Sequence, residues 1–86
     1  MANWKTDSHL EQHFGRRRAE FRGASLEEYD ASARDTLDVG TYFESFDEDS
    51  GDWRTGCYHR ETRRLSVLDE DGFILSHFRM WRKVRS

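Results

Sequence analysis

Proline is absent from this 86-residue sequence, and cysteine occurs only once, as Cys57. A single cysteine excludes a disulfide within the chain, and a free thiol is typical of a reducing compartment such as the cytosol. Long hydrophobic runs are also missing, since no segment approaches the roughly 20 apolar residues needed to cross a bilayer. Residues 1–5 do not have the pattern of a signal peptide. We therefore expect no membrane partner and a cytoplasmic site of action, reached after synthesis or after delivery into the cytosol of a target cell.

Hydrophobic residues make up only 35% of the chain, whereas charged residues make up 36%. Aromatic residues, at 14%, offset this shortage because each can bury a large area in a small core. Their number argues against disorder. A chain of this length cannot fill two hydrophobic cores, so we expect a single domain over residues 1–86.

The charges are unevenly distributed, although the net charge is only −3. Between Glu27 and Asp52 there are ten acidic residues and one basic residue, Arg34. Basic residues gather instead near the two ends, as Arg16, Arg17, Arg18 and Arg22 and as Arg79, Arg82, Lys83 and Arg85. A protein that is acidic overall can still present a basic face to phosphate. This distribution fits a nucleic-acid contact surface and an ordinary solvated surface equally well.

Two segments in the first half of the chain have helical periodicity. Ser8 and Glu11 have the spacing of a capping box, in which each side chain bonds the backbone of the other residue, and they predict a helix over residues 8–22. Ser25 and Glu28 repeat this spacing and predict a second helix over residues 25–38, with Gly40 placed as its C-terminal cap. The core-facing residues at helical spacing are Leu10, Phe14 and Phe21 in the first helix and Leu26, Tyr29, Ala33 and Leu37 in the second.

After Gly40 the periodicity changes from 3.6 to 2, which is typical of strands. We expect strands at residues 41–46, 53–59, 65–68 and 73–80, with Asp71-Gly72 as the clearest hairpin signal. Short connections favour antiparallel neighbours, so residues 41–80 should form a meander in sequence order. The predicted fold class is therefore α+β, with two N-terminal helices packed on one face of a four-stranded antiparallel β-meander.

Histidine is the residue that first suggests chemistry, with four copies in the chain. His9 and His13 are four residues apart in the first predicted helix, a spacing that can bind zinc when a third ligand is near. A polar helix edge is the more common interpretation of such a pair, and we expect no metal ion. Cys57 and His59 share a face of the second predicted strand, where a buried structural thiol is the simpler interpretation.

Cleavage of a phosphodiester would use more of the polar side chains in this sequence than metal binding or a thiol nucleophile would. Cleaving RNA without a metal ion or cofactor needs a group that accepts the 2′-hydroxyl proton, a group that protonates the leaving oxygen, and cations that stabilise the developing negative charge. Histidine transfers protons near neutral pH, and arginine matches phosphate geometry. The candidate catalytic residues are His13, Arg17, Ser76, His77 and Arg79, and the supporting residues are Arg54, Tyr58 and Thr62.

The same residues also have ordinary structural interpretations. His13 and Arg17 suit a solvated helix surface, and Tyr58 suits a core position with its hydroxyl bonded. In the last strand, alternation places His77 and Arg79 on one face, which looks functional, and Ile74 and Ser76 on the other.

Two parts of the chain resemble a known family. The first part is His13-Phe14-Gly15-Arg16-Arg17-Arg18-Ala19-Glu20-Phe21 with Ser25-Leu26-Glu27-Glu28-Tyr29. The second is the spaced pattern formed by Tyr58, Thr62, Leu65, Val67, Asp71-Gly72, Ile74, Ser76, Phe78 and Arg79. Over about residues 10–79 the sequence thus resembles small bacterial ribonuclease toxin domains of the barnase–EndoU–colicin–RelE-like (BECR) superfamily. These domains occur in polymorphic and contact-dependent toxins and in prophage proteins.

The resemblance implies the fold expected above, metal-independent cleavage of RNA, often tRNA, and an immunity protein or antitoxin as partner. It implies His13 as general base or acid, Arg17 and Arg79 as a phosphate clamp, Ser76 as a positioning group and His77 as a second proton carrier. Further RNA contacts would come from Arg16, Arg18 and Arg82. The chain departs from the family at Arg17, which replaces a second histidine. Because arginine cannot shuttle protons at neutral pH, either His13 and His77 share that task or catalysis has been lost.

An alternative function belongs to a different class of protein. The chain would then be a non-catalytic phage or bacterial regulatory module that docks on a protein partner. Its contact surface would be the acidic stretch from Glu44 to Asp52. The altered residue at position 17 is compatible with this alternative.

Overall fold

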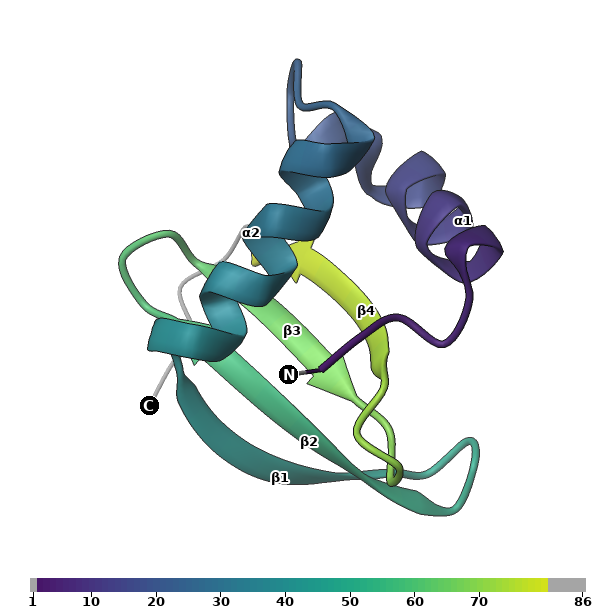
Figure 1. The fold of residues 1–86 in the computed structure, drawn as a ribbon. Coiled ribbons are helices and arrows are strands. Elements are labelled where there is room, and N and C mark those ends of the chain that lie inside the picture. The colour runs from purple at the N-terminus through teal and green to yellow at the C-terminus, as the bar shows by residue number, and fades with distance from the viewer. Residues whose placement is uncertain (1, 81–86) are drawn as a thin grey trace.

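The computed structural model describes residues 2–80, which form two α-helices followed by four β-strands (Figure 1). The helices are α1, Asp7–Arg17, and α2, Leu26–Val39, and one 3₁₀ turn, η1, Arg18–Glu20, directly follows α1. The strands are β1, Thr41–Asp47, β2, Asp52–His59, β3, Arg64–Leu68, and β4, Ile74–Arg79. They form an antiparallel sheet in the order β1-β2-β3-β4. The prediction of an α+β fold, with N-terminal helices and a meander, is confirmed.

Helix α1 begins earlier and ends earlier than the sequence predicts. Its N-cap is Thr6, whose hydroxyl oxygen accepts a hydrogen bond from the His9 amide at 3.0 Å, so the predicted Ser8–Glu11 capping box is wrong. Thr and Ser are both good caps, and a cap at Thr6 puts Asp7 in the first turn, where the helix dipole favours a carboxylate. The α-helical segment ends at Arg17, and the chain continues as η1 rather than as α-helix to residue 22.

Helix α2 forms as its capping signals predict. The Glu28 amide donates to the Ser25 hydroxyl at 3.1 Å, and the Ser25 amide donates to the Glu28 carboxylate at 3.0 Å. The predicted apolar stripe is buried at Tyr29, Ala33 and Leu37. These residues form the core together with Trp4, Phe21, Cys57 and Ile74, with Leu10 and Phe14 packed at its margin.

The two helices occupy different places on the sheet. Helix α2 crosses one face over β2 and β3, whereas α1 lies alongside β4 (Figure 1). The segment before α1 also covers β4, because the Ile74 amide donates to the Asn3 carbonyl at 2.8 Å and Trp4 is buried beside it. The Trp4 indole in turn donates to Asp30 of α2 at 2.8 Å. The face of the sheet opposite α2 is therefore left for other contacts.

A bulge in β4 changes which of its side chains share a face. Val67 pairs with Ser76 but Leu68 pairs with Ile74, so Leu75 is an extra residue in the ladder. As a result Ile74 and His77 are both fully buried. Strict alternation predicted opposite faces for them, and that prediction is wrong. Among residues 2–80, neither helix is long and apolar enough to cross a membrane.

Gly40, at the end of α2, offers a test of this packing. A Cβ atom there would lie 2.6 Å from the Thr36 carbonyl oxygen and 2.7 Å from the Cys57 sulfur. We expect Gly40→Ala to lower the free energy of unfolding by about 1–3 kcal/mol, because the backbone of α2 must move to relieve the overlap. Urea denaturation measures this change.

Gly15→Ala is the matched control for Gly40→Ala. A Cβ atom at Gly15, in the interior of α1, would meet nothing within 4 Å. Alanine should therefore stabilise the protein there, by up to about 1 kcal/mol from helix propensity alone. A Gly40→Ala protein as stable as the wild type would contradict the close approach of α2 to β2.

Candidate functional site

A groove of about 490 Å³ lies on the face of the sheet opposite α2. Cys57, Ser66 and His77 are buried beneath α2, so residues adjacent to them in their strands, Gly56, Val67 and Ser76, face the other way. The lining comes from α1 and from each of the strands: His9, His13, Phe43, Ser45, Phe46, Asp47, Arg54, Gly56, Leu65, Val67, Leu75 and Ser76.

The floor of the groove is shaped by one row of paired residues. Phe43 pairs with Gly56, Gly56 with Val67, and Val67 with Ser76 across neighbouring strands. The ring of Phe43 lies over Gly56, where an added Cβ atom would overlap it. The absence of a side chain at position 56 therefore lets an aromatic ring and the Ser76 hydroxyl share the floor.

His13 lies on the α1 wall of this groove and is half-buried. Burial lowers the pKa of His13 from its ordinary value of 6.5, and the nearby charges of His9, Arg16 and Arg17 lower it further. The imidazole is consequently neutral at pH 7 and can accept a proton. Its Nδ1 atom is buried without a hydrogen-bond partner among the described residues.

His9 places a second imidazole beside the first. The ring centroids of His9 and His13 are 4.5 Å apart, and the indole of Trp4 packs about 6 Å from each ring, at 6.0 and 5.9 Å. The His9 Nε2 atom lies 2.9 Å from the Leu75 carbonyl oxygen. Because a carbonyl only accepts, Nε2 carries a hydrogen and Nδ1 is the nitrogen that can gain or lose one.

The sequence predicts for His9 only two roles, as half of a possible zinc pair or as part of a polar helix edge. Its i,i+4 spacing from His13 is the signal that the two side chains share one helix face. Within residues 2–80, no three His, Cys, Asp or Glu side chains gather closely enough to hold a metal ion.

Arg54 brings a cation to the β1–β2 turn end of the groove. Its guanidinium donates to the Ser50 hydroxyl at 3.2 Å and lies 3.9 Å from the Asp52 carboxylate. Of the residues predicted as catalytic or supporting, the structure thus brings His13, Ser76 and Arg54 to one groove. Tyr58 lines an adjoining cavity of about 330 Å³ that shares Phe43 and Leu65 with this groove.

Arg17 does not line the groove, although it is close to it. Its guanidinium lies 4.8 Å from the centre of the Phe78 ring and donates to Glu20 at 3.1 Å. Arg17 acts on the groove through its charge, which is one of the causes that lower the pKa of His13. The predicted phosphate clamp of Arg17 and Arg79 does not form around a single space.

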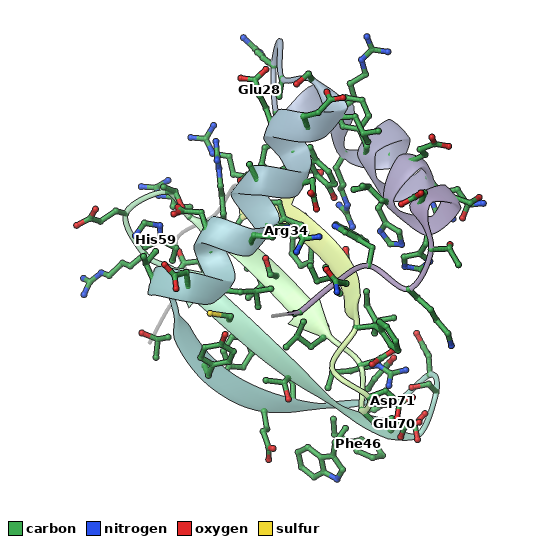
Figure 2. All side chains as sticks on the ribbon, viewed as in Figure 1. Glu28, Arg34, Phe46, His59, Glu70 and Asp71 are labelled. Atoms are coloured by element: carbon green, nitrogen blue, oxygen red, sulfur yellow. The ribbon has the colours of Figure 1, made fainter. Side chains whose placement is uncertain are left out.

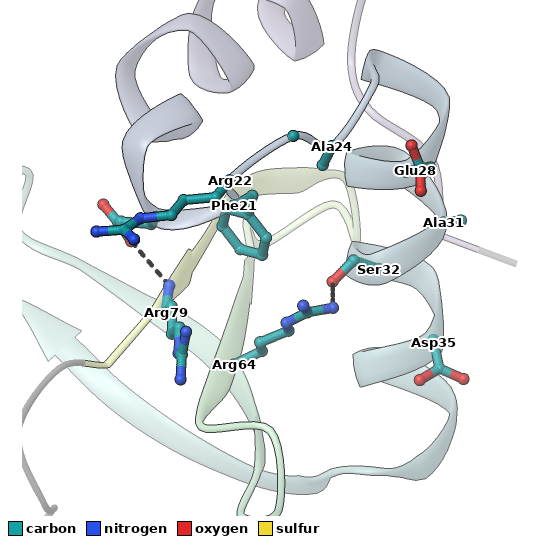
Figure 3. A pocket seen from close by; sticks show the side chains of 11 residues that line it. Phe21, Arg22, Ala24, Glu28, Ala31, Ser32, Asp35, Arg64 and Arg79 are labelled. Atoms are coloured by element: carbon teal, nitrogen blue, oxygen red, sulfur yellow. Dashed lines mark hydrogen bonds between the residues drawn. The ribbon is translucent and has the colours of Figure 1, made fainter.

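Arg79 lies in a different cavity, of about 830 Å³, between η1, α2 and the paired ends of β3 and β4 (Figure 3). Its backbone amide donates to Glu20 at 2.9 Å. The neighbouring Arg64, its partner across the strands, donates to the Ser32 hydroxyl at 2.6 Å. This cavity and the histidine groove have no lining residue in common.

His77 is excluded from the groove because it is fully buried beneath α2. Its Nδ1 atom bonds the Ser66 hydroxyl at 2.8 Å and the Leu65 carbonyl at 3.1 Å, and its Nε2 atom bonds the Ser32 hydroxyl at 2.8 Å. Burial, reinforced by the charge of Arg64, lowers the pKa of His77 to about 4. The prediction that His77 lies on an accessible functional face and carries protons there is wrong.

The remaining predicted residues have other surroundings. Thr62 lies in the β2–β3 turn, where its hydroxyl is 3.1 Å from the Nδ1 atom of His59. Arg16 and Arg18 are exposed on and directly after α1, and Arg82 lies outside the described residues. Cys57 is buried and donates to the Thr36 carbonyl, and burial raises the pKa of its thiol, which suits a structural role.

The chain matches no protein-family model, no curated protein and no solved structure. The resemblance to BECR ribonuclease toxin domains therefore stays a prediction from the sequence.

The buried His77 generates a pH-dependent stability. Its pKa is about 4 in the folded protein and near 6.5 in the unfolded chain, so the unfolded state binds more protons in this interval. We expect this group to cost about 3 kcal/mol of stability as the pH falls from 6.5 to 4, and to contribute no change above pH 6.5. NMR titration of the His77 ring protons should give a midpoint near 4.

A substitution at position 77 distinguishes the loss of stability caused by His77 from that caused by other groups that bind protons in acid. His77→Gln keeps an amide that can bond Ser32 but has no titration near neutral pH, so stability between pH 6.5 and 5 should depend less on pH than in the wild type. A His77 midpoint at or above 6 would contradict the buried position.

Proposed function

We propose that this protein is a metal-independent ribonuclease whose active site is the groove between α1 and the open face of the sheet. The observation that supports the proposal is one shared cavity that contains two adjacent imidazoles, a hydroxyl and a guanidinium, from His9, His13, Ser76 and Arg54. Its volume, about 490 Å³, is in the range of ordinary ligand sites. These groups are the ones that RNA cleavage without a metal ion needs.

The proposed reaction is attack of a ribose 2′-hydroxyl on the adjacent phosphorus. A new bond forms between the 2′-oxygen and phosphorus, and the bond from phosphorus to the 5′-oxygen of the next nucleotide breaks. Neutral His13 accepts the 2′-hydroxyl proton, and protonated His9 donates a proton to the leaving 5′-oxygen. The products are a 2′,3′-cyclic phosphate end and a 5′-hydroxyl end.

Arg54 and Ser76 are assigned to the phosphate oxygens. A guanidinium forms strong, charge-assisted hydrogen bonds to a phosphate, and a hydroxyl can add one more. The lowered pKa of His13 supports its assignment as base, because the ring is neutral at the pH where RNA would be cleaved. Compared with the roles implied by the sequence, His9 takes the place of His77, and Arg54 takes the place of Arg17 and Arg79.

RNA would approach along α1. Arg16 and Arg18 are exposed there, and their guanidinium groups would attract the phosphates of RNA although the whole chain is acidic. As part of this proposal, the protein acts on RNA in the cytoplasm, and a cell that contains it needs an immunity protein or antitoxin.

His13→Ala tests the assignment of the base. We expect it to reduce RNA cleavage by at least about 100-fold, since positioned proton transfer contributes on the order of 10² to 10⁴ in rate. The thermal midpoint should stay nearly unchanged because His13 is only half-buried. The assay follows a short labelled RNA and identifies cyclic phosphate at the new end.

His59→Ala is the control for this variant, because His59 lies in the β2–β3 turn region with Thr62, outside the groove. It should cleave RNA as the wild type does. Full activity of His13→Ala, or wild-type protein that cleaves nothing and is harmless at high expression, would remove the enzyme proposal and favour the regulatory binding module.

His9→Ala tests the assignment of the acid through the pH dependence of kcat/KM. The wild-type rate should fall at low pH as His13 becomes protonated. The low-pH limb should lie below pH 6.5 because the pKa of His13 is lowered. His9→Ala should cleave RNA at least about 100-fold more slowly than the wild type. Its remaining activity should still fall at low pH, at a higher pH than in the wild type, because the charge of His9 helps to lower the pKa of His13. Wild-type activity in His9→Ala would exclude His9 as the acid.

A further inference from the structure

The two edges of the sheet differ in whether other parts of the chain cover them. The edge at β4 is covered by α1 and by the segment that contains Asn3 and Trp4. The edge at β1 has no neighbouring strand among residues 2–80, since β1 is first in the sheet order. Six of its seven residues are exposed. The outward-facing backbone groups of an open edge strand can pair with another extended chain.

Large apolar side chains accompany this open edge. We define the hairpin patch as Val39, Tyr42, Phe46 and Trp53, which are 53%, 53%, 47% and 62% exposed. Phe46 and Trp53 are cross-strand partners whose rings pack edge to face with centroids 5.4 Å apart. Phe46 lies near the turn end of the hairpin (Figure 2). Tyr42 lies four residues earlier on the same strand, and exposed aromatic side chains are typical of protein contact sites.

The charge of the hairpin selects the kind of partner. From Thr41 to Trp53 the chain carries only acidic charges, at Glu44, Asp47, Glu48, Asp49 and Asp52. A second copy pairing through its own β1 would bring two acidic strands together, and like charges on facing strands are destabilising. Along the open edge of β1 the phosphates of a nucleic acid would be repelled for the same reason, whereas the groove also contains the cation of Arg54. A basic polypeptide is the complementary occupant.

We propose that β1 binds an extended, lysine- or arginine-bearing segment of another protein, which adds to the sheet as a fifth strand. The backbone of β1 pairs with that of the partner, the hairpin patch receives its apolar side chains, and the acidic residues attract its cations. This proposal does not depend on the ribonuclease activity, because its binding surface does not require the histidines.

Synthetic peptides provide the test, with the whole 86-residue protein as receptor. The probe is an eight-residue peptide that alternates lysine and valine, and its control replaces lysine with glutamate. We expect the lysine peptide to bind, with affinity that falls as salt is raised, and to slow amide hydrogen exchange in β1. The glutamate peptide should not bind. A lysine peptide with alternate amides N-methylated should also fail, because it cannot pair with the strand.

Charge variants of the protein locate the binding. Glu44→Lys, in the exposed middle of β1, should weaken binding of the lysine peptide by roughly fivefold or more. Glu11→Lys makes the same change on the exposed surface of α1 beside β4, and should leave binding essentially unchanged. Trp53→Ala should also weaken binding, since it removes part of the hairpin patch.

Three results would overturn the proposal. Equal binding of the lysine and glutamate peptides would show that charge does not select the partner. Sedimentation as a dimer that excludes the peptide would assign β1 to a second copy of the chain. Binding of a single-stranded oligonucleotide that alters the fluorescence of wild-type protein but not of Trp53→Ala, with no peptide binding, would assign the hairpin patch to nucleic acid.

Discussion

Helix α2 is joined to the sheet by a row of buried polar contacts, and the location of the groove follows from this row. The Cys57 thiol, the Ser66 hydroxyl and the His77 ring occupy neighbouring positions on β2, β3 and β4. They bond the Thr36 carbonyl, the Ala33 carbonyl and the Ser32 hydroxyl of α2 at 3.1, 3.0 and 2.8 Å. Because adjacent residues of a strand point to opposite faces, this row directs Gly56, Val67 and Ser76 to the open face.

The same row explains why the histidine of β4 is structural. Ser66 donates its hydrogen to Ala33, so the His77 Nδ1 atom must donate to Ser66, and Nε2 is left to accept from Ser32. A neutral imidazole satisfies each of these bonds, whereas a second ring proton would face the hydroxyl that also accepts from Arg64. A buried polar network of this kind is stable only when its members are satisfied. The hydrogen bonds of this network favour the neutral His77 ring, and the low dielectric of the protein interior favours it as well.

The groove and the hairpin lie on parts of the molecule that the helices leave uncovered. Helix α1 packs against β4 rather than beneath the sheet, so its histidines form a wall of the open face. Gly56 leaves room for the Phe43 ring on the floor. Beyond the reach of α2, the β1–β2 hairpin has no helix over it, which accounts for the exposure of Phe46 and Trp53. Two surfaces that meet at Phe46 therefore come from one short chain, one with proton-transfer groups and one with acidic and aromatic residues.

By itself, the sequence determined the features that depend on near neighbours. The Ser25–Glu28 cap, the apolar stripe of α2, the strand periods and the meander are local signals, and the structure contains them. Of the candidate site, His13, Ser76 and Arg54 could be selected because their side chains suit phosphate chemistry. Tertiary structure alone decided that the His9–His13 pair faces the same groove as Ser76 and Arg54, that His77 is buried and that Arg79 faces another cavity. These outcomes depend on the Leu75 bulge and on the packing of α1 beside β4, which arise from contacts between residues distant in the sequence.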